Sequence, residues 1–383
     1  MKILFVAMQY IHSARWINQL KDSGHEIYLF DCLDKPIHSD LRWTHNISDW
    51  SCRKVPYIKG EYFLEKKFPR IYSFLEPFLK LTASEKLLEV IMELQPDLVH
   101  SLEMQSETYP LIKVRQKIPF KWAYSSWGSD LFLYQNNPIH CEKIKKVFKE
   151  LDYLFTDNYR DVLLAKELQF KNKVSGVFPG GGGYELEKIQ KSMVKVEDRK
   201  LILIKGYDHW AGKALNVLSA LELLINDLVG YEIYVYSAHD VVVNKINSLN
   251  KQHKLGITYS SRFSEISHES LMEKFGAARI AIGNSISDGI PNTLLEALIM
   301  GAFPIQSNPG KVSEDYIRNG ENGFLIEDPE NVGEIASHIK KALENPELIL
   351  KASKINEEIA ESLAYSEVQK NVLKSYWEIE SEL

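Results

Sequence analysis

Short apolar runs alternate with amphipathic stretches along this chain, and the whole series is repeated once. None of the runs approaches the ~18–20 apolar residues of a membrane span, so each is interpreted as a buried strand. Strands that alternate with helices form a parallel sheet with helices on both faces. The sequence therefore predicts an α/β protein with two doubly wound halves. Strands are expected at residues 3–7, 27–31, 97–100, 121–125, 151–156 and 174–179 in the first series, and at 201–205, 232–237, 257–260, 280–283, 303–306 and 323–326 in the second.

The length of 383 residues also indicates two domains, because one hydrophobic core seldom serves so long a chain. Residues 186–199 are polar and weakly patterned, and the linker is expected there. This predicts one Rossmann-like domain over residues 1–190 and a second over 196–365. A last helix is expected at 366–383, where it can pack back on the first domain or stay with the second.

The charge distribution and the cysteine content exclude several classes of function for this protein. The net charge of −6 divides into +2 over residues 1–190 and −8 over the remainder, which argues for separate roles of the two halves. Neither half is basic enough for duplex nucleic acid. The three cysteines form no Cys-x-x-Cys pair and the histidines form no His-Glu-x-x-His motif, so we expect reduced cytoplasmic thiols and no metal. The first apolar run lacks a cleavage site, which favours a strand over a signal peptide.

The strongest chemical signal lies in residues 285–305. A buried run is followed by a turn that contains Gly289 and Pro291, and then by a helix. The free N–H groups at such a helix start favour a phosphate. Asp288 precedes the helix and Glu296 lies one turn inside it, where carboxylates can accept hydrogen bonds from sugar hydroxyls. This arrangement predicts a nucleotide-sugar ligand. The alternative is that the first acid caps the turn and the second only favours the helix dipole.

The same segment resembles the acidic-x7-Glu signature of family 4 retaining glycosyltransferases, which have the GT-B fold. Asp288 and Glu296 stand at its two ends, with Gly289 and Pro291 between them. The resemblance is best over residues 200–345 and looser in the first half. Supporting stretches follow in the family's order at residues 97–100, 126–130, 205–213 and 320–325.

This resemblance implies two Rossmann-like domains that face each other across a cleft, the first for the acceptor and the second for the donor. It also implies metal-independent, retaining transfer of a hexosyl group from a nucleotide-diphosphate sugar to a hydroxyl. Glu296 would bind the ribose hydroxyls of the nucleotide, and Asp288 would contact hydroxyls of the donor sugar and rank among the catalytic residues.

The diphosphate would be held, on the same resemblance, by the N–H groups of Thr293 and Leu294, with Lys213 adding positive charge. The family's arginine position is Tyr207 in this chain, so Lys205 is a second candidate for that charge. The donor-binding residues implied or suggested are Glu296, Thr293, Leu294, Asn292, Gly289, Lys213, Lys205, Arg262 and Phe263.

Arg262 and Phe263 are included because they follow the strand expected at 257–260, where a GT-B domain would rest the nucleotide base. An exposed loop is the alternative interpretation of this pair.

Three residues of the first half are further catalytic candidates. His12 follows the first strand, at the place where a doubly wound domain opens a crevice. The alternative there is a surface loop in which Ser13 caps a helix. His100 ends a strand, where it either contacts substrate or is a satisfied buried histidine. Asp130 lies on a loop after a strand, where it either orients the acceptor hydroxyl or caps a helix.

Residues 59–80 mix lysine and arginine with aromatic side chains. In an interfacial segment, rings enter the headgroup layer and lysines face anionic lipid, so this composition predicts contact with a membrane surface. The alternative is a helical insertion whose aromatic side chains pack inward.

Together these features predict a cytoplasmic glycosyltransferase, placed peripherally at the inner face of the membrane, that builds a surface polysaccharide or lipopolysaccharide. Its partners would be a nucleotide-sugar donor and a glycan or lipid-linked acceptor, with no nucleic acid, no cofactor and no metal. No protein nucleophile stands out, which fits transfer on one face of the sugar, with the departing diphosphate taking the acceptor proton. Two alternatives stay open: a nucleotide-sugar epimerase on the same fold, and a non-catalytic nucleotide-sugar-binding module.

Overall fold

The computed structural model describes residues 1–264 and 266–383 and divides the chain into two compact units. Unit 1 comprises Met1–Asp157, Asp161–Gly180 and Val372–Leu383, and unit 2 comprises Asn158–Arg160 and Gly181–Asn371. Each unit contains one parallel sheet with interleaved helices, so the predicted pair of doubly wound α/β halves is confirmed.

Unit 1 contains a seven-stranded sheet in the order β3-β2-β1-β4-β5-β6-β7, with every neighbouring pair parallel. The six strands expected in this half are present, within a few residues of their predicted ends. The edge strand β3 was not predicted, because it has only three residues and two of them, His45 and Asn46, are polar. The strands are β1 (Lys2–Val6), β2 (Glu26–Phe30), β3 (His45–Ile47), β4 (Leu98–Leu102), β5 (Trp122–Ser125), β6 (Tyr153–Thr156) and β7 (Lys173–Val177).

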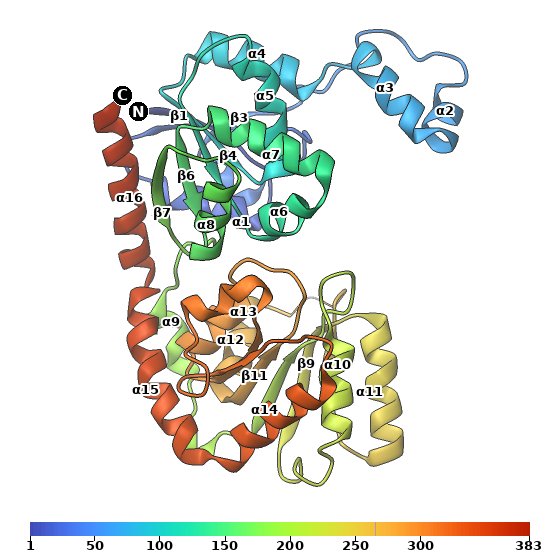
Figure 1. The fold of residues 1–383 in the computed structure, drawn as a ribbon, viewed down its shortest axis with the longest axis vertical. Coiled ribbons are helices and arrows are strands. Elements are labelled where there is room, and N and C mark those ends of the chain that lie inside the picture. The colour runs from blue at the N-terminus through green and yellow to red at the C-terminus, as the bar shows by residue number, and fades with distance from the viewer. Residues whose placement is uncertain (265) are drawn as a thin grey trace. The chain divides into compact units, whose positions relative to one another are not determined.

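Helices cover both faces of this sheet, and one helical hairpin projects away from it (Figure 1). The core on one face is formed by side chains of the strands and of α4, α5 and α7. The projecting pair is α2 and α3, which pack mainly on each other. The helices that contribute to unit 1 are α1 (Ile11–Ile17), α2 (Glu61–Lys67), α3 (Pro69–Leu79), α4 (Ala83–Leu94), α5 (Tyr109–Arg115), α6 (Ser129–Phe132), α7 (Pro138–Glu150), α8 (Tyr159–Glu167) and the end of α16 (Tyr365–Glu382).

The other face of the unit 1 sheet is closed by α1 and by the end of α16. Tyr376 of α16 is fully buried, and its hydroxyl lies 3.1 Å from Trp16 Nε1 and 2.7 Å from His100 Nδ1. The rings of Phe5 and Phe155 pack around this trio. The last twelve residues of the chain, Val372–Leu383, therefore complete the core of a domain that begins at Met1.

Unit 2 contains a six-stranded parallel sheet in the order β10-β9-β8-β11-β12-β13. Helices α10, α11 and α14 supply the core of one face, α12 and α13 supply the other, and α15 contributes to both. The strands are β8 (Leu201–Lys205), β9 (Glu232–Ala238), β10 (Thr258–Ser261), β11 (Ala278–Gly283), β12 (Phe303–Ser307) and β13 (Phe324–Ile326). The helices are α9 (Leu186–Ile189), α10 (Ala214–Glu222), α11 (Asp240–His253), α12 (His268–Ala277), α13 (Asn292–Ile299), α14 (Val332–Glu344) and α15 (Pro346–Ser362).

The strand order reverses once in each sheet, and this reversal fixes where a ligand can enter. The reversal falls between β1 and β4 in unit 1 and between β8 and β11 in unit 2. Connections on the two sides of such a point leave in opposite directions and open a crevice at the carboxyl ends of the strands. The loops that follow these four strands are therefore the places to examine for function.

The chain passes between the units at Gly180–Gly181, ahead of the polar stretch at 186–199. That stretch is not a free linker, because it packs on unit 2: Gln190 Nε2 donates to Ile299 O at 2.8 Å, and Val194 N donates to Gly276 O at 3.1 Å. Its polar composition serves hydrogen bonds to the ends of helices α12 and α13, a use that patterning alone does not reveal.

Candidate functional site

Two loops meet at the switch point of unit 2. One follows β8 and the other connects β11 to α13. Asn284 Nδ2 donates to Lys213 O at 3.2 Å, and Ile286 N donates to Ala211 O at 2.9 Å. Ser285 N donates to Ser307 Oγ at 2.9 Å, which ties the second loop to the end of β12 as well. These hydrogen bonds hold both loops in one arrangement, so the side chains that they carry are positioned before any ligand arrives.

Asp288 lies on the second loop, just before α13. It is partly buried, and burial raises the pKa of its carboxyl while the positive charge of Lys205 opposes that rise. Glu296 lies one turn inside α13 and is 4% exposed. Its Oε1 is 2.9 Å from Nε2 of His268, which stands at the start of α12. One oxygen of Glu296 is thus oriented by a neighbour, and the second is left for another partner.

The start of α13 leaves N–H groups at the same place. Pro291 occupies the N-cap position and supplies no side-chain cap. The N–H groups of Asn292 and Thr293 have no acceptor within the helix, as expected for the first turn. The N–H of Leu294 differs, because it donates to Pro291 O at 2.9 Å. The expectation that Leu294 offers a free N–H is therefore wrong, and Asn292 with Thr293 takes its place.

Cationic side chains gather around the ring of Tyr207, in the loop after β8. Lys205 Nζ lies 4.8 Å from the ring centre and Arg262 Cζ lies 4.5 Å from it. The imidazole of His239 stacks on the same ring, with centroids 5.5 Å apart and planes 7° from parallel. Burial and the charges of His239 and Arg262 lower the pKa of His209. Two permanently charged cations, Lys205 and Arg262, therefore lie against Tyr207 beside the switch point of unit 2.

Lys213, the other predicted cation, is differently engaged. Its Nζ lies 3.3 Å from Glu330 Oε1, so its charge is partly neutralised. Phe263, next to Arg262, is 81% exposed and carries a ring free to stack on a planar group. Gly289 is buried in the turn before α13.

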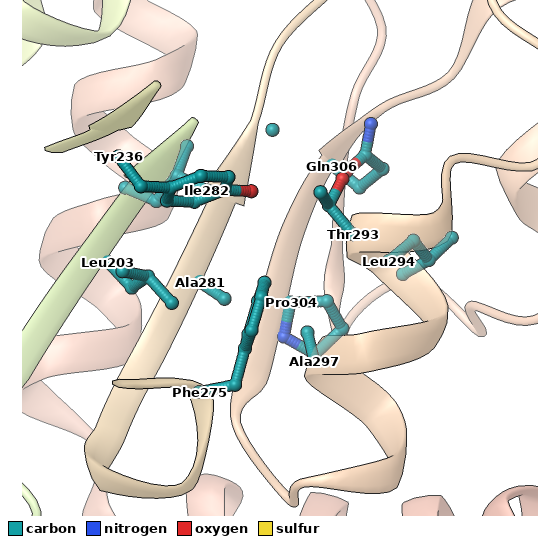
Figure 2. Close-up of a pocket in the computed structure, with 11 residues that line it drawn as sticks. Leu203, Tyr236, Phe275, Ala281, Ile282, Thr293, Leu294, Ala297, Pro304 and Gln306 are labelled. Carbon is teal, nitrogen blue, oxygen red and sulfur yellow. The ribbon is translucent and has the colours of Figure 1, made fainter. Parts of the chain in front are cut away.

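A small pocket lies beneath the first turn of α13, lined by Tyr236, Thr293, Gln306 and Gly283 among others. Figure 2 shows Tyr236 reaching in from one side and Thr293 with Gln306 standing on the other. The space holds little more than one water molecule. Thr293 Oγ1 is buried in this pocket and lies within reach of the Tyr236 side chain, although the two make no hydrogen bond of good geometry. A Cβ at Gly283 would lie 2.4 Å from Gln306 Oε1, so a larger residue there would have to displace the end of the Gln306 side chain.

The switch point of unit 1 is built differently. His100 is fully buried, with Nδ1 bonded to Tyr376 and Nε2 lying 2.9 Å from Ser125 Oγ. Burial lowers its pKa to about 3, so the ring is neutral. A histidine with both nitrogens used inside a core cannot reach substrate, and the buried-histidine interpretation of His100 is the correct one.

The hydrogen-bonding capacity of Asp130 is likewise used within its own domain. Its carboxylate accepts hydrogen bonds from Met104 N at 3.1 Å, Trp127 N at 2.9 Å and the Tyr124 hydroxyl at 2.6 Å. Burial raises the pKa of this carboxyl to about 7. The group pins the loop between β5 and α6 to its neighbours, which corrects the expectation that it orients an acceptor hydroxyl.

His12 is the one unit 1 candidate left at the surface of its domain. It lies in the first turn of α1 and packs edge-on against Tyr10 and Trp127. Tyr10 holds the N-cap position, so Ser13, which is fully buried, does not cap this helix.

The described residues contain neither a metal-binding cluster nor a helix able to span a membrane. Residues 1–264 and 266–383 contain no group of three or more His, Cys, Asp or Glu side chains placed to hold a metal ion. No helix in the same ranges combines the length and the apolar character needed to cross a bilayer.

Two family models match this chain. Residues 2–158 match the model described as "Glycosyl transferase 4-like", and residues 215–359 match "Glycosyl transferases group 1". The second match contains the whole Asp288–Glu296 segment. These matches support a glycosyltransferase of the GT-B fold. No curated protein matches the chain.

Solved structures agree on the GT-B fold. Sucrose-phosphate synthase (tll1590) from Thermosynechococcus elongatus aligns over 100% of both chains with a TM-score of 0.69 at 14% identity. Anabaena Alr3699/HepE, solved with UDP-glucose, covers 100% of both chains with a TM-score of 0.66 at 11% identity. The lipopolysaccharide outer core galactosyltransferase WaaB, in its apo form, covers 100% of both chains with a TM-score of 0.67 at 14% identity. At such identities the likeness concerns the fold alone.

The sequence patterns missed three side chains of the unit 2 crevice. His268 was missed because only folding brings α12 against α13, twenty-eight positions further along the chain. His239 and Tyr236 sit at the end of β9, where the apolar run gave no reason to single out either residue. A useful signal existed for two of them: Tyr236 and His239 lie at the carboxyl end of β9, the strand next to β8 at the switch point.

Proposed function

We propose that this protein transfers a hexosyl group from a nucleotide-diphosphate sugar to a hydroxyl acceptor, with retention of anomeric configuration and without a metal. The observation that carries the proposal is the arrangement of Asp288, the open first turn of α13 and Glu296 at the switch point of unit 2, inside the segment matched by the group 1 family model. Anabaena HepE has been solved with UDP and with UDP-glucose, which supports a nucleotide-sugar as the donor.

Each group has a distinct role in the proposed complex. Glu296, oriented by His268, accepts hydrogen bonds from the ribose hydroxyls through its free oxygen. Asp288 accepts hydrogen bonds from hydroxyls of the donor sugar. The N–H groups of Asn292 and Thr293 donate to the diphosphate, where the positive end of the α13 dipole adds to the attraction.

The cations around Tyr207 take over the charge that the family's arginine would supply. Lys205 and Arg262 flank the tyrosine ring at 4.8 and 4.5 Å, so two cations lie beside the residue that occupies the family's arginine position. Negative charge grows on the leaving diphosphate as the glycosidic bond breaks, and cations placed there stabilise the transition state more than the ground state. Lys213 contributes less, because Glu330 already neutralises part of its charge.

The chemical step needs no protein nucleophile. The bond from the anomeric carbon to the diphosphate oxygen breaks, and the acceptor hydroxyl attacks from the same face. The departing diphosphate oxygen takes the acceptor proton, so charge and atoms balance between donor and acceptor. The residues of unit 2 bind, orient and stabilise charge; His100 and Asp130 take no part.

The acceptor we propose is a glycan or a lipid-linked saccharide, met in the cytoplasm at the inner face of the membrane during synthesis of a surface polysaccharide or lipopolysaccharide. The similarity in fold to WaaB, a lipopolysaccharide outer core galactosyltransferase, supports this setting.

A donor screen followed by product analysis tests the proposal. UDP-, GDP- and ADP-sugars are compared for the increase in melting temperature that each causes, because a ligand bound only by the folded chain stabilises it. The best donor is then incubated with candidate lipid-linked acceptors in the presence of EDTA, and the anomeric configuration of the product is read by NMR. We expect retention and undiminished turnover in EDTA. Inversion, a requirement for metal, isomerised sugar from donor alone, or binding without release for every acceptor would each overturn a part of the proposal.

A further inference from the structure

The α2–α3 hairpin of unit 1 exposes an apolar face that no described element covers. Figure 1 shows this hairpin standing away from the rest of its unit. Ile71, Phe74, Leu75 and Phe78 follow one another at the i, i+3, i+4, i+7 spacing of a single helix face. These side chains are 52%, 74%, 36% and 68% exposed in that order. The alternative interpretation of residues 59–80, in which the aromatic side chains pack inward, is therefore wrong for this face.

Aromatic side chains extend the apolar face beyond α3. Tyr57, Tyr62 and Phe63 are 81%, 67% and 60% exposed, and Phe68 between the two helices is 47% exposed. Only Tyr72 of the aromatic residues on the hairpin is buried, and its hydroxyl donates to Glu61. An exposed cluster of this size on a soluble domain marks an interaction site.

The charges of the hairpin are unbalanced in favour of cations. Of its acidic residues, Glu61 is bonded by Arg53 and Glu76 by Lys80. The remaining charges are four cations against the single acid Glu65. Those cations are Lys59, Lys66, Lys67 and Arg70.

The hairpin is held rigidly enough to present this face. Arg53 binds Glu61 through two hydrogen bonds of 2.8 and 2.7 Å, and Tyr72 donates to the same carboxylate at 3.1 Å. Backbone hydrogen bonds from Lys54 N to Leu79 O and from Leu81 N to Cys52 O close its base. The exposed rings are therefore carried on an anchored structure and not on a frayed segment.

We propose that the α2–α3 hairpin docks this protein on an anionic lipid bilayer. The rings and aliphatic side chains of the face defined by Ile71, Phe74, Leu75 and Phe78 enter the headgroup region, and the four unpaired cations contact the lipid phosphates. A membrane fits better than a protein partner of complementary charge. The exposed aromatic side chains and the neighbouring cations match the apolar interior and the anionic headgroups of one bilayer surface. The inference does not depend on the proposed reaction.

Co-sedimentation of the full chain with vesicles tests the docking. We compare vesicles of phosphatidylcholine alone with vesicles that contain about one third phosphatidylglycerol. We expect binding to the anionic vesicles that weakens as salt is raised. Phe74→Ser with Phe78→Ser, and separately Lys66→Glu with Lys67→Glu, should each weaken that binding about ten-fold or more.

Matched controls come from unit 2. Leu223 and Val229 are 66% and 81% exposed, so Leu223→Ser with Val229→Ser removes the same kind of surface elsewhere. Lys251→Glu with Lys254→Glu, both exposed, is the control for charge reversal. Melting temperatures verify that all variants are folded. Equal vesicle binding by parent and hairpin variants would overturn the proposal. So would a dimer in sedimentation velocity that Phe74→Ser with Phe78→Ser abolishes while no vesicle binding is seen, since the face would then serve self-association.

Discussion

The candidate polar residues of the two units are used in opposite ways. In unit 1, His100 lies in the middle of β4 and Asp130 lies in α6, and each has its hydrogen bonds satisfied by its own domain. In unit 2, Asp288 is only partly buried and Glu296 keeps one oxygen free. Position at a crevice is therefore not enough to mark a ligand contact; the side chain must also have bonding capacity that the fold leaves unused.

Replacing two acids of unit 2 and one of unit 1 by their amides is the sharpest test of this contrast. Glu296→Gln and Asp288→Asn should each lower kcat/KM about 100-fold or more with little change in melting temperature, because each carboxylate serves substrate. Asp130→Asn should instead lower stability and leave activity nearly unchanged. Its buried carboxylate accepts three hydrogen bonds, so the amide should cost about 2 kcal/mol of stability while kcat/KM of the folded protein stays within a few-fold of the parent.

Steady-state kinetics and denaturant unfolding on the same preparations measure both effects. Glu269→Gln, an exposed acid on the helix beside Glu296, is the control. A large activity loss in Asp130→Asn without destabilisation would return that residue to the site and remove the contrast.

The buried His100 predicts a pH dependence specific to unit 1. Its folded pKa is about 3, below the ordinary value of 6.5, because burial disfavours the charged ring. Between these values the unfolded chain binds more protons, so stability decreases as pH falls from 6.5 toward 3. The contribution of this group approaches about 1.4 kcal/mol per pH unit.

The measurement is the difference in unfolding free energy between parent and His100→Gln from neutral pH down to about pH 5. The parent should lose more stability than the variant over this interval. Identical slopes would show that His100 is not buried as a neutral ring.

The cations around Tyr207 give a smaller effect, confined to unit 2. Lys205→Ala and Arg262→Ala should each lower kcat/KM for the donor about ten-fold, because each removes one positive charge from the leaving diphosphate. Lys213→Ala should cost about two- to three-fold, since Glu330 already pairs with it. Initial-rate kinetics at varied donor concentration rank the three substitutions by their loss of kcat/KM. A loss in Lys213→Ala that exceeds both others would move the diphosphate toward α10.

In unit 1, the α2–α3 hairpin is the region whose apolar and cationic side chains remain exposed. The ion pair between Arg53 and Glu61 that anchors this hairpin gives the smallest predicted effect. Arg53 lowers the pKa of Glu61 to about 2, so the stabilisation is complete above the ordinary value of 4.5 and is lost as pH falls toward 2. Glu61→Gln should speed proteolysis within residues 54–80 a few-fold and leave kcat/KM unchanged. Limited proteolysis with Glu65→Gln as the control measures this. In the parent, pepsin should find the hairpin more accessible as pH is lowered through that interval.

The strands were predictable because each is a continuous apolar run bounded by polar residues. β8 falls at the predicted residues 201–205, and α13 begins at Asn292 after the predicted turn. β3 escaped prediction because three residues at a sheet edge need no apolar pattern. The polar stretch at 186–199 was mistaken for a linker because hydrogen bonds to distant helix ends leave no local signature.

The spacing of Asp288 and Glu296 around a turn and a helix start was determined by the sequence alone, because a short helix fixes the relation of residues along it. The alternation of strands and helices determined the two α/β halves for the same local reason. What only the tertiary structure decided was which polar groups remain available. His100 is satisfied by Tyr376, which lies 276 positions away, and Arg262 reaches Tyr207 from another strand. Long-range contacts decide whether a polar side chain is bonded within the fold or left for a ligand, and no local pattern encodes them.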